Sequence, residues 1–212
     1  MENDLEFRSF TAEYETREEG DEGIIVGRPV VYGQTTKLPW FDETIAPGAL
    51  DGADLTDVRL CLNHDTDYVY ARSRRNTPGS TMTLVTDERG MEINARLNTK
   101  GSPKAQDLYS AVSRGDISGM SFMFSVAEDK WSDLDTEHPT RTILKIRSVV
   151  EVSAVTFPAY TDTSISARSE TALENARREL ENARKRNAGQ PEGSDTANEL
   201  ALEKEKLKII GG

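Results

Sequence analysis

Three residues in this sequence have side chains of the types that carry out acyl transfer by a serine: His64, Ser121 and Glu151. A serine hydroxyl attacks a carbonyl efficiently only when a neighbouring base takes its proton. That base in turn needs an acceptor that fixes its tautomer and stabilises the imidazolium. One histidine, one serine and one acid can supply these roles if the fold brings them together, so the segments around each residue decide the question.

Ser121 lies where a glycine turn leads into a strand. From Met120 to Val126 apolar and polar residues alternate, which predicts a strand with Ser121 and Met123 on one face. The turn at 115–119 precedes it and would bring backbone N–H groups close to the serine. Ser118, in the same turn, is the rival candidate for a nucleophile.

His64 ends a second predicted strand, in which apolar residues alternate from Val58. Two interpretations are open: a partly buried histidine bonded to a backbone carbonyl, or a catalytic base. Cys61 falls on the opposite face of that strand, which disfavours a cysteine–histidine pair and indicates a small buried residue. The other histidine, His138, lies in a polar loop beside Pro139, and we expect it to be exposed and without function.

Glu151 lies within 149–157, the most apolar run of the chain. A carboxylate buried there must be neutral, paired or hydrogen-bonded, because an unpaired buried charge costs several kcal/mol. The other interpretation is an edge strand with Glu151 facing water. In that case Asp65 and Asp116 are the next candidates for the orienting acid.

Composition narrows the class of protein. A net charge of −11 argues against direct binding to nucleic acid, which requires clustered Lys and Arg. With one cysteine and two histidines, neither an internal disulfide nor an ordinary structural zinc site is expected. The N-terminus lacks the features of a signal peptide, and no apolar run approaches the ~20 residues of a membrane span, so we expect a cytosolic protein.

The pattern of the whole chain is typical of a mainly β domain with a charged tail. A helix is expected from Pro103 to Val112, with Ser102 as its N-cap and Gly115 closing it. A turn-rich loop with one helical turn is expected over 35–55. Near Arg168 the composition changes, which predicts a domain over 1–168 and a charged helical or disordered tail over 169–212. Strands are predicted over 5–14, 23–33, 58–64, 81–85, 90–97, 120–126 and 143–157.

The segments around the three candidate residues, in this order, resemble the prohead (capsid maturation) serine proteases of tailed phages. The Asn-His-Asp block is also similar to that of the herpesvirus assembly proteases, with which the phage family is thought to share a fold. The resemblance covers roughly Phe7 to Arg168. It is carried by Tyr32-Gly33, Ile45-Ala46-Pro47-Gly48-Ala49, Leu62-Asn63-His64-Asp65, 115–122 and 151–159.

The resemblance implies that His64 is the base, Ser121 the nucleophile and Glu151 the orienting acid, with no cofactor. It implies a compact antiparallel β-barrel surrounded by a few helices. One position departs from the family pattern: two residues after the serine, where glycine is usual, this chain has Met123.

The function implied is endoproteolysis inside the assembling procapsid in the host cytoplasm. The substrates would be the scaffold segment and the major capsid protein, and the protease itself, with a possible oligomer and no nucleic-acid or membrane partner. The charged tail would be an assembly segment. The alternative is an inactive, protease-like scaffolding protein. A small-molecule serine hydrolase is disfavoured, because no Gly-x-Ser-x-Gly elbow is present.

Overall fold

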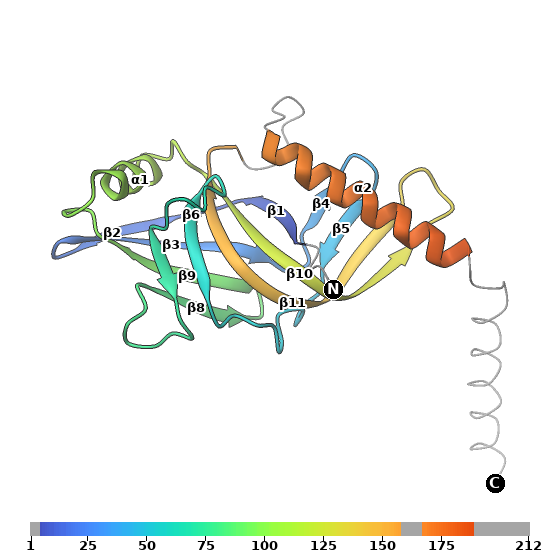
Figure 1. Ribbon diagram of the computed structural model, residues 1–212, viewed down its shortest axis with the longest axis horizontal. Coiled ribbons are helices and arrows are strands. Elements are labelled where there is room, and N and C mark those ends of the chain that lie inside the picture. Colours follow the sequence, from blue (N-terminus) through green and yellow to red (C-terminus); the bar gives the residue numbers. More distant parts are fainter. Residues whose placement is uncertain (1–4, 158–166, 189–212) are drawn as a thin grey trace, which may run out of the picture.

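The computed structural model describes residues 5–157 and 167–188. Strands predominate, as the alternating sequence predicts, and two sheets share one hydrophobic core (Figure 1). The elements are β1 (Glu6–Thr11), β2 (Glu15–Glu19), β3 (Glu22–Val31), β4 (Thr35–Lys37), β5 (Asp42–Ile45), β6 (Val58–Leu62), β7 (Ala71–Ser73), β8 (Met82–Asp87), β9 (Gly90–Leu97), α1 (Pro103–Ser113), β10 (Gly119–Ser132), β11 (Thr140–Val155) and α2 (Ala167–Ala188).

The larger sheet is built around a long hairpin of β10 and β11. Its strand order is β1-β10-β11-β5-β4. The first part of β11 pairs in parallel with β5, and its last part pairs in parallel with β6, which in turn pairs with β7. Four irregularities in the β10–β11 register bend the hairpin between these two parts. The end of β11 therefore lies between β10 and β6, the strands that carry Ser121 and lead into His64.

The smaller sheet has the order β2-β3-β9-β8 and is antiparallel throughout. Apolar side chains from both sheets meet in a single core, in which Phe122, Met120 and Ile93 are fully buried. The expected mainly β class is confirmed. Within residues 5–157 and 167–188 the two sheets do not close into one barrel, so the predicted barrel remains a prediction.

Helix α1 forms as its capping residues predict. Ser102 Oγ accepts the N–H of Ala105 at 3.3 Å, and Pro103 occupies the first turn. Gly115 has φ +76°, the left-handed conformation that ends a helix and is least costly for glycine. The following turn leads directly into β10, so α1 sets the point at which that strand begins.

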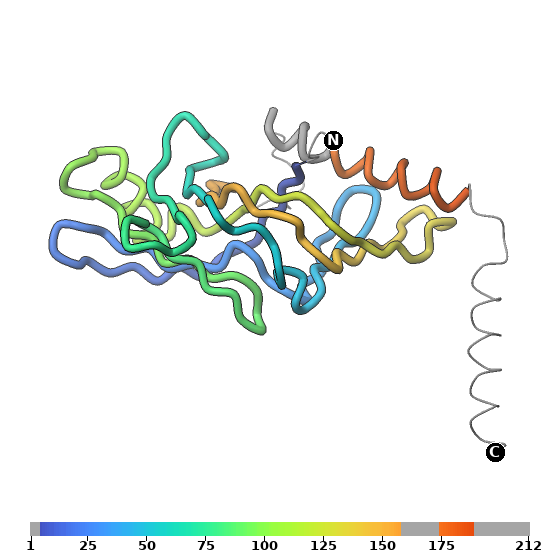
Figure 2. The backbone as a smooth tube through the Cα atoms, turned by 60° about the horizontal axis from the view of Figure 1, so that its bottom comes forward, coloured from blue at the N-terminus to red at the C-terminus, as the bar shows by residue number. Residues whose placement is uncertain are grey.

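Helix α2 lies along the opposite end of the molecule from α1 (Figures 1 and 2). Its sequence has few apolar residues and predicts shallow burial, but Ala176, Leu180 and Ala183 are buried in the structure. Leu180 packs in a cluster with Leu38 and Phe41. Two alanines and one leucine are enough to bury one side of α2, because their spacing of four and three residues places them in a narrow stripe along the helix. The predicted boundary near Arg168 falls at the start of α2 and remains a prediction, and the part of the predicted tail over 189–212 lies outside the described residues.

Two short strands, β4 and β5, occupy the segment that was expected to be a loop with one helical turn. Turn residues dominate 35–55, and these strands have only 3 and 4 residues, so their own pattern is too short to detect. These strands form because β5 pairs with β11 and β4 pairs with β5. Within the ranges that the structure describes, no helix has the length and apolarity to cross a membrane.

A buried ion network ties β1 to the middle of the larger sheet. Arg8 Nε lies 2.5 Å from Glu43 Oε1, and Arg8 Nη2 lies 2.7 Å from Glu6 Oε2. Arg141 Nη1 lies 2.7 Å from Glu6 Oε2 and 3.0 Å from Glu43 Oε2, and its Nε lies 2.8 Å from Asp129 Oδ2. Burial alone would raise the pKa of Glu6, but the charges of Arg8 and Arg141 outweigh it and hold that pKa below its ordinary value. The network therefore fixes β1 against β10, β11 and β5.

Candidate active site

Ser121 and Glu151 rise from adjacent strands on one face of the larger sheet. Ser121 on β10 is directly opposite Ser153 on β11, and Met123 is opposite Glu151. Opposite residues of a strand pair project to the same face, as do residues two apart on one strand. Ser121, Met123, Ser153 and Glu151 therefore share a face. Met123 shares the face of Ser121, as the alternation predicts.

The imidazole of His64 is bonded to the carboxylate of Glu151. The distance from Nδ1 to Oε2 is 2.7 Å, and the side chains are 13% and 3% exposed. Glu151 thus lies in a central strand with a partner, and the interpretation as a water-facing edge residue is wrong. Because a carboxylate accepts hydrogen bonds, the neutral ring carries its proton on Nδ1, which leaves the Nε2 lone pair free to act as a base.

A left-handed turn presents His64 at the end of β6. Asn63 has φ +51° and His64 has φ +59°, in a region that few residues other than glycine adopt. The Asn63 side chain stabilises the turn: its Nδ2 donates to Thr156 Oγ1 at 3.0 Å, and its Oδ1 accepts the N–H of Thr156 at 2.9 Å. The Asn63 N–H donates to the carbonyl of Ala154 at 2.9 Å. The turn is therefore anchored to the last part of β11 and the residue after it, three and five residues beyond Glu151.

The ring of His64 lies across β10. On one side it contacts Glu151 of β11, and on the other its centroid is 4.9 Å from that of Phe7 of β1, in an edge-to-face arrangement. Phe7 is directly opposite Met123 in the β1–β10 register. Since β10 separates β1 from β11, a ring in contact with both lies above β10, at the level of Met123, which is opposite both Phe7 and Glu151.

The hydroxyl of Ser121 is buried and donates to the backbone carbonyl of Arg8 at 2.9 Å. Arg8 belongs to β1, on the side of β10 away from Glu151. The structure therefore brings His64 and Glu151 into direct contact, whereas the hydroxyl of Ser121 is bonded to the neighbouring strand β1.

Cys61 is fully buried, as its apolar surroundings predict. It is opposite Ser153 in the parallel β6–β11 register and therefore lies on the face that carries Glu151, so the expectation that it lies on the face away from His64 is wrong. Burial, followed by the negative charge of Glu151, raises the pKa of the thiol to about 12. Such a thiol stays protonated at neutral pH and cannot serve as a nucleophile.

The alternative candidates are exposed, whereas Ser121 and Glu151 are buried. Ser118 is exposed and precedes β10. Asp116 is also exposed and is bonded to Arg114, with a closest distance of 2.5 Å. Asp65 follows His64 on the surface, where its carboxylate accepts the N–H of Asp67 at 3.2 Å. The side chain of His138 is 47% exposed, as expected, and its Nε2 lies 3.0 Å from Asp42 Oδ1.

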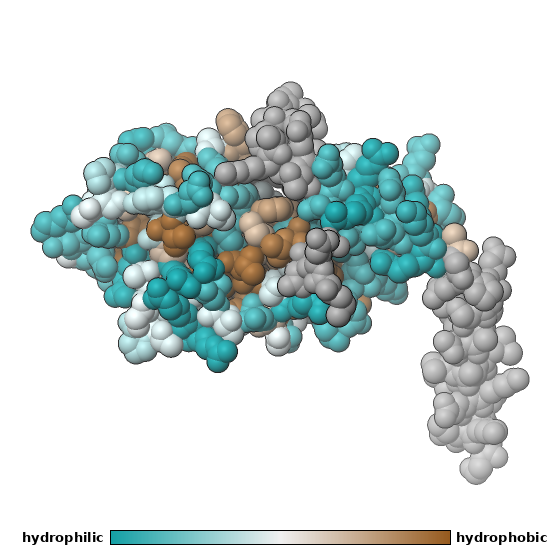
Figure 3. All heavy atoms as spheres, in the orientation of Figure 1, coloured by the Kyte–Doolittle hydropathy of each residue, from teal (hydrophilic) through white to brown (hydrophobic). Residues whose placement is uncertain are grey.

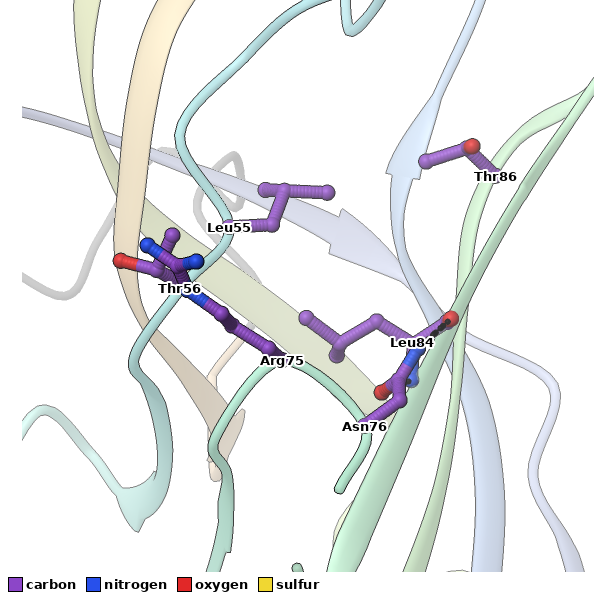
Figure 4. A pocket seen from close by; sticks show the side chains of 6 residues that line it. All are labelled: Leu55, Thr56, Arg75, Asn76, Leu84 and Thr86. Atoms are coloured by element: carbon purple, nitrogen blue, oxygen red, sulfur yellow. Dashed lines mark hydrogen bonds between the residues drawn. The ribbon is translucent and has the colours of Figure 1, made fainter.

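A hollow of about 340 Å³ lies elsewhere, between the loop at Leu55 and β8 (Figure 4). Asn76 on its wall is held by two backbone bonds to Leu84, of 3.0 and 2.9 Å. Its lining holds neither a histidine nor a carboxylate, so it offers no acid–base pair. It is lined by Leu55, Thr56, Arg75, Asn76, Leu84 and Thr86.

Two residues that contact the site were not singled out in the sequence. Ser153 is bonded to both Glu151 and His64, and Phe7 packs on the imidazole ring. Ser153 lies in the apolar run around Glu151, where a lone serine on a strand carries no special signal. Asn63 precedes the histidine, and its tolerance of left-handed backbone is the one local signal that could have indicated the turn.

A histidine held by a buried glutamate, with a serine on the adjacent strand, is the arrangement found in hydrolases that use a serine nucleophile. Comparison with known proteins agrees with this class. The profile of the Caudovirus prohead serine protease family matches residues 11–179. The chain belongs to the Caudovirus prohead serine protease family.

One relative is the prohead protease of Enterobacteria phage HK97, which is 32% identical over 153 residues. That alignment covers 70% of this chain and 61% of the relative, so the chain spans about three-fifths of the length of the relative it matches. No solved structure matched significantly.

Proposed function

We propose that this chain is a serine endopeptidase of the Ser-His-Glu type that acts in the procapsid during head maturation. The observation that carries the proposal is the 2.7 Å contact between His64 Nδ1 and Glu151 Oε2, made above the strand that carries Ser121. Membership of the prohead protease family supports the same activity.

The chemistry begins with the Ser121 hydroxyl, which leaves the Arg8 carbonyl and donates to His64 Nε2. As Oγ attacks the scissile carbonyl, its proton passes to Nε2, and the charge on the ring is stabilised by Glu151. The imidazolium then protonates the leaving amine, and the acyl group remains on Ser121. Water attacks the acyl-enzyme in a second round, with His64 again taking and returning the proton.

The burial of Glu151 strengthens its effect on the histidine. Its side chain is 3% exposed, so water screens its attraction for the imidazolium only weakly. The negative charge on the tetrahedral intermediate requires donors too, and backbone N–H groups near Ser121 are suited to that role.

The substrates we propose are the scaffold segment and the major capsid protein, together with the protease itself, within the procapsid in the host cytoplasm. The name of the HK97 relative supports a role in the prohead. The likeness to a herpesvirus-protease barrel remains part of the proposal.

A serine-reactive fluorophosphonate tests the nucleophile. We expect the full chain to be labelled once, at Ser121, and the label to disappear in Ser121→Ala and in His64→Ala. Ser118→Ala is the matched control and should be labelled at the rate of the parent chain. Labelling at Ser118, or persistence of the label in Ser121→Ala, would overturn the assignment, and no labelling at all would favour an inactive scaffolding protein.

Cleavage is tested by mixing the chain with the scaffold and capsid proteins encoded by the same phage. Fragments should appear with the parent chain and be absent with Ser121→Ala. Fragments that persist with Ser121→Ala would show that another residue or another protein cuts these substrates.

A further inference from the structure

Ser153 occupies the centre of the candidate site, although the acyl-transfer chemistry described above does not use it. It lies on β11, opposite Ser121 on one side and opposite Cys61 on the other. Its side chain is fully buried, and its hydroxyl makes two hydrogen bonds. It accepts the backbone N–H of His64 at 2.9 Å and donates to Oε1 of Glu151.

The direction of these two bonds is fixed by chemistry. A backbone N–H can only donate, so the bond from His64 uses a lone pair of Ser153 Oγ. The single hydroxyl proton of Ser153 is then free to point at the Glu151 carboxylate, which can only accept while ionised. Each carboxylate oxygen of Glu151 therefore has its own partner: Oε1 has Ser153, and Oε2 has the His64 ring.

The same hydroxyl thus controls both ends of His64. At the backbone end it holds the N–H of a residue whose φ of +59° is costly for a side chain with a Cβ. At the ring end it restrains the carboxylate that bonds Nδ1. A carboxylate held at one oxygen cannot turn about its last torsion without losing a charge-assisted bond.

We infer that Ser153 is a positioning residue for the base: it locks Glu151 and the His64 turn in one arrangement, so that Nε2 faces the strand of Ser121. This inference rests on the proposed function for its effect on rate, but its effect on the His64 ring can be measured independently of activity. A purely structural serine, one that fills space in β11, would have neither effect.

The test compares Ser153→Ala with Ser148→Ala. Ser148 also lies on β11, and its hydroxyl bonds Ser125 on β10 at 2.8 Å, away from Glu151. Each substitution therefore removes one hydroxyl from the same strand. Ser153→Thr restores a hydroxyl at the site and serves as the rescue variant.

The first readout is the second-order rate of fluorophosphonate labelling at Ser121. Loss of an outer partner of this kind is expected to slow labelling by about 10–100-fold in Ser153→Ala. Ser148→Ala should stay within twofold of the parent chain. Ser153→Thr, where it folds, should recover part of the loss, and a lack of folding in that variant leaves the comparison of the two alanine variants intact.

The second readout is the ring Nδ1 proton of His64 in NMR spectra of the full chain. The sequence contains two histidines, so His138 on the surface provides an internal reference. In the parent chain and in Ser148→Ala, the proton between Nδ1 and Glu151 should give a low-field resonance that exchanges slowly. In Ser153→Ala the resonance should move upfield or broaden by exchange with water, while the signals of His138 stay in place.

The outcomes separate the inference from the proposed function. If the parent chain is not labelled, the proposed function fails, while the proton readout still tests the arrangement of Ser153, Glu151 and His64. If labelling in Ser153→Ala stays within twofold of the parent rate, or the Nδ1 proton is unchanged, the positioning role is wrong. Equal effects in Ser148→Ala would also overturn it, because they would indicate a general weakening of β11.

Discussion

Replacing Arg141 by methionine should destabilise the fold strongly, because this guanidinium links three carboxylates in the buried network. Arg141 contacts Glu6, Glu43 and Asp129 within 3.0 Å, and its side chain is 1% exposed. In the variant, Arg8 alone remains to balance these three acids. Removing one partner from a buried ion pair typically costs about 3–5 kcal/mol, and we expect a loss of that size. At roughly 2–4 °C per kcal/mol for a chain of this length, the melting temperature should fall by roughly 6–20 °C.

Urea unfolding followed by circular dichroism measures this loss as a shift in midpoint at constant slope. The matched control is Lys145→Met on the same strand, since Lys145 pairs with Glu128 at 2.6 Å but is 63% exposed. An exposed pair contributes about 0–1 kcal/mol, so the control should barely move. If Arg141→Met shifts the midpoint no more than Lys145→Met does, the buried network does not hold the sheet together and the reasoning is refuted.

The same network sets how stability depends on pH. The pKa of Glu6 is held below its ordinary value in the folded state, so its contribution is present above that ordinary value and is lost as the pH falls through the lowered one. Unfolding midpoints should therefore fall in the acid range, below about pH 4.5. In Arg141→Met the acid-dependent loss should be smaller, because one of the two charges that lower the pKa of Glu6 is gone and its folded-state pKa moves back toward the ordinary value. Identical acid profiles for the two chains would contradict this.

Three further predictions concern single side chains. Glu151→Gln should reduce fluorophosphonate labelling by about 10²–10⁴-fold without unfolding the chain, because an amide can present a donor to Nδ1; labelling at the parent rate would remove Glu151 from the site. Cys61 should not react with Ellman's reagent at pH 8 until the chain is unfolded, since its pKa of about 12 and its burial keep the thiol protonated and covered; rapid reaction of the folded chain would contradict this. Leu180→Ala should lower the free energy of unfolding in urea by about 2 kcal/mol, because Leu180 packs in a buried cluster. Arg177→Ala, on the exposed side of α2, should change it by less than about 0.5 kcal/mol. Equal effects of the two substitutions would show that α2 does not depend on this packing.

Local sequence was sufficient where one element determines its own structure. Ser102 and Gly115 mark the two ends of α1, and alternation places Ser121 and Met123 on one face of β10. The contact between His64 and Glu151 joins residues 87 positions apart. The residue types indicated that the two side chains could form such a pair, but local sequence could not show that they lie close together. The family resemblance supplied that pairing.

The features that the sequence did not reveal depend on pairing between distant segments. The local sequence around Arg8 and Arg141 is that of ordinary charged residues, and only the assembly of β1, β10, β11 and β5 into one sheet buries them among their acidic partners. The sequence shows Ser153 only as a serine in an apolar strand. Its bond to the turn after β6 depends on the pairing of β6 with β11. Helix α2 has too little apolar surface to predict its burial, which depends on Phe41 and its neighbours.

The two consecutive left-handed residues, Asn63 and His64, restrict which sequences can keep this arrangement. At position 63 the backbone, at φ +51°, favours glycine, asparagine and aspartate, and the two bonds to Thr156 require an amide that both donates and accepts. Glycine would adopt the left-handed backbone but has no amide side chain to bond Thr156. Glutamine has the amide but does not favour the left-handed backbone. In a library that samples every residue at every position and is selected for activity, position 63 should therefore be nearly as intolerant of substitution as the three proposed catalytic positions, although the proposed reaction does not use its side chain. Backbone geometry can in this way constrain the residue before His64 as strictly as chemistry constrains His64 itself.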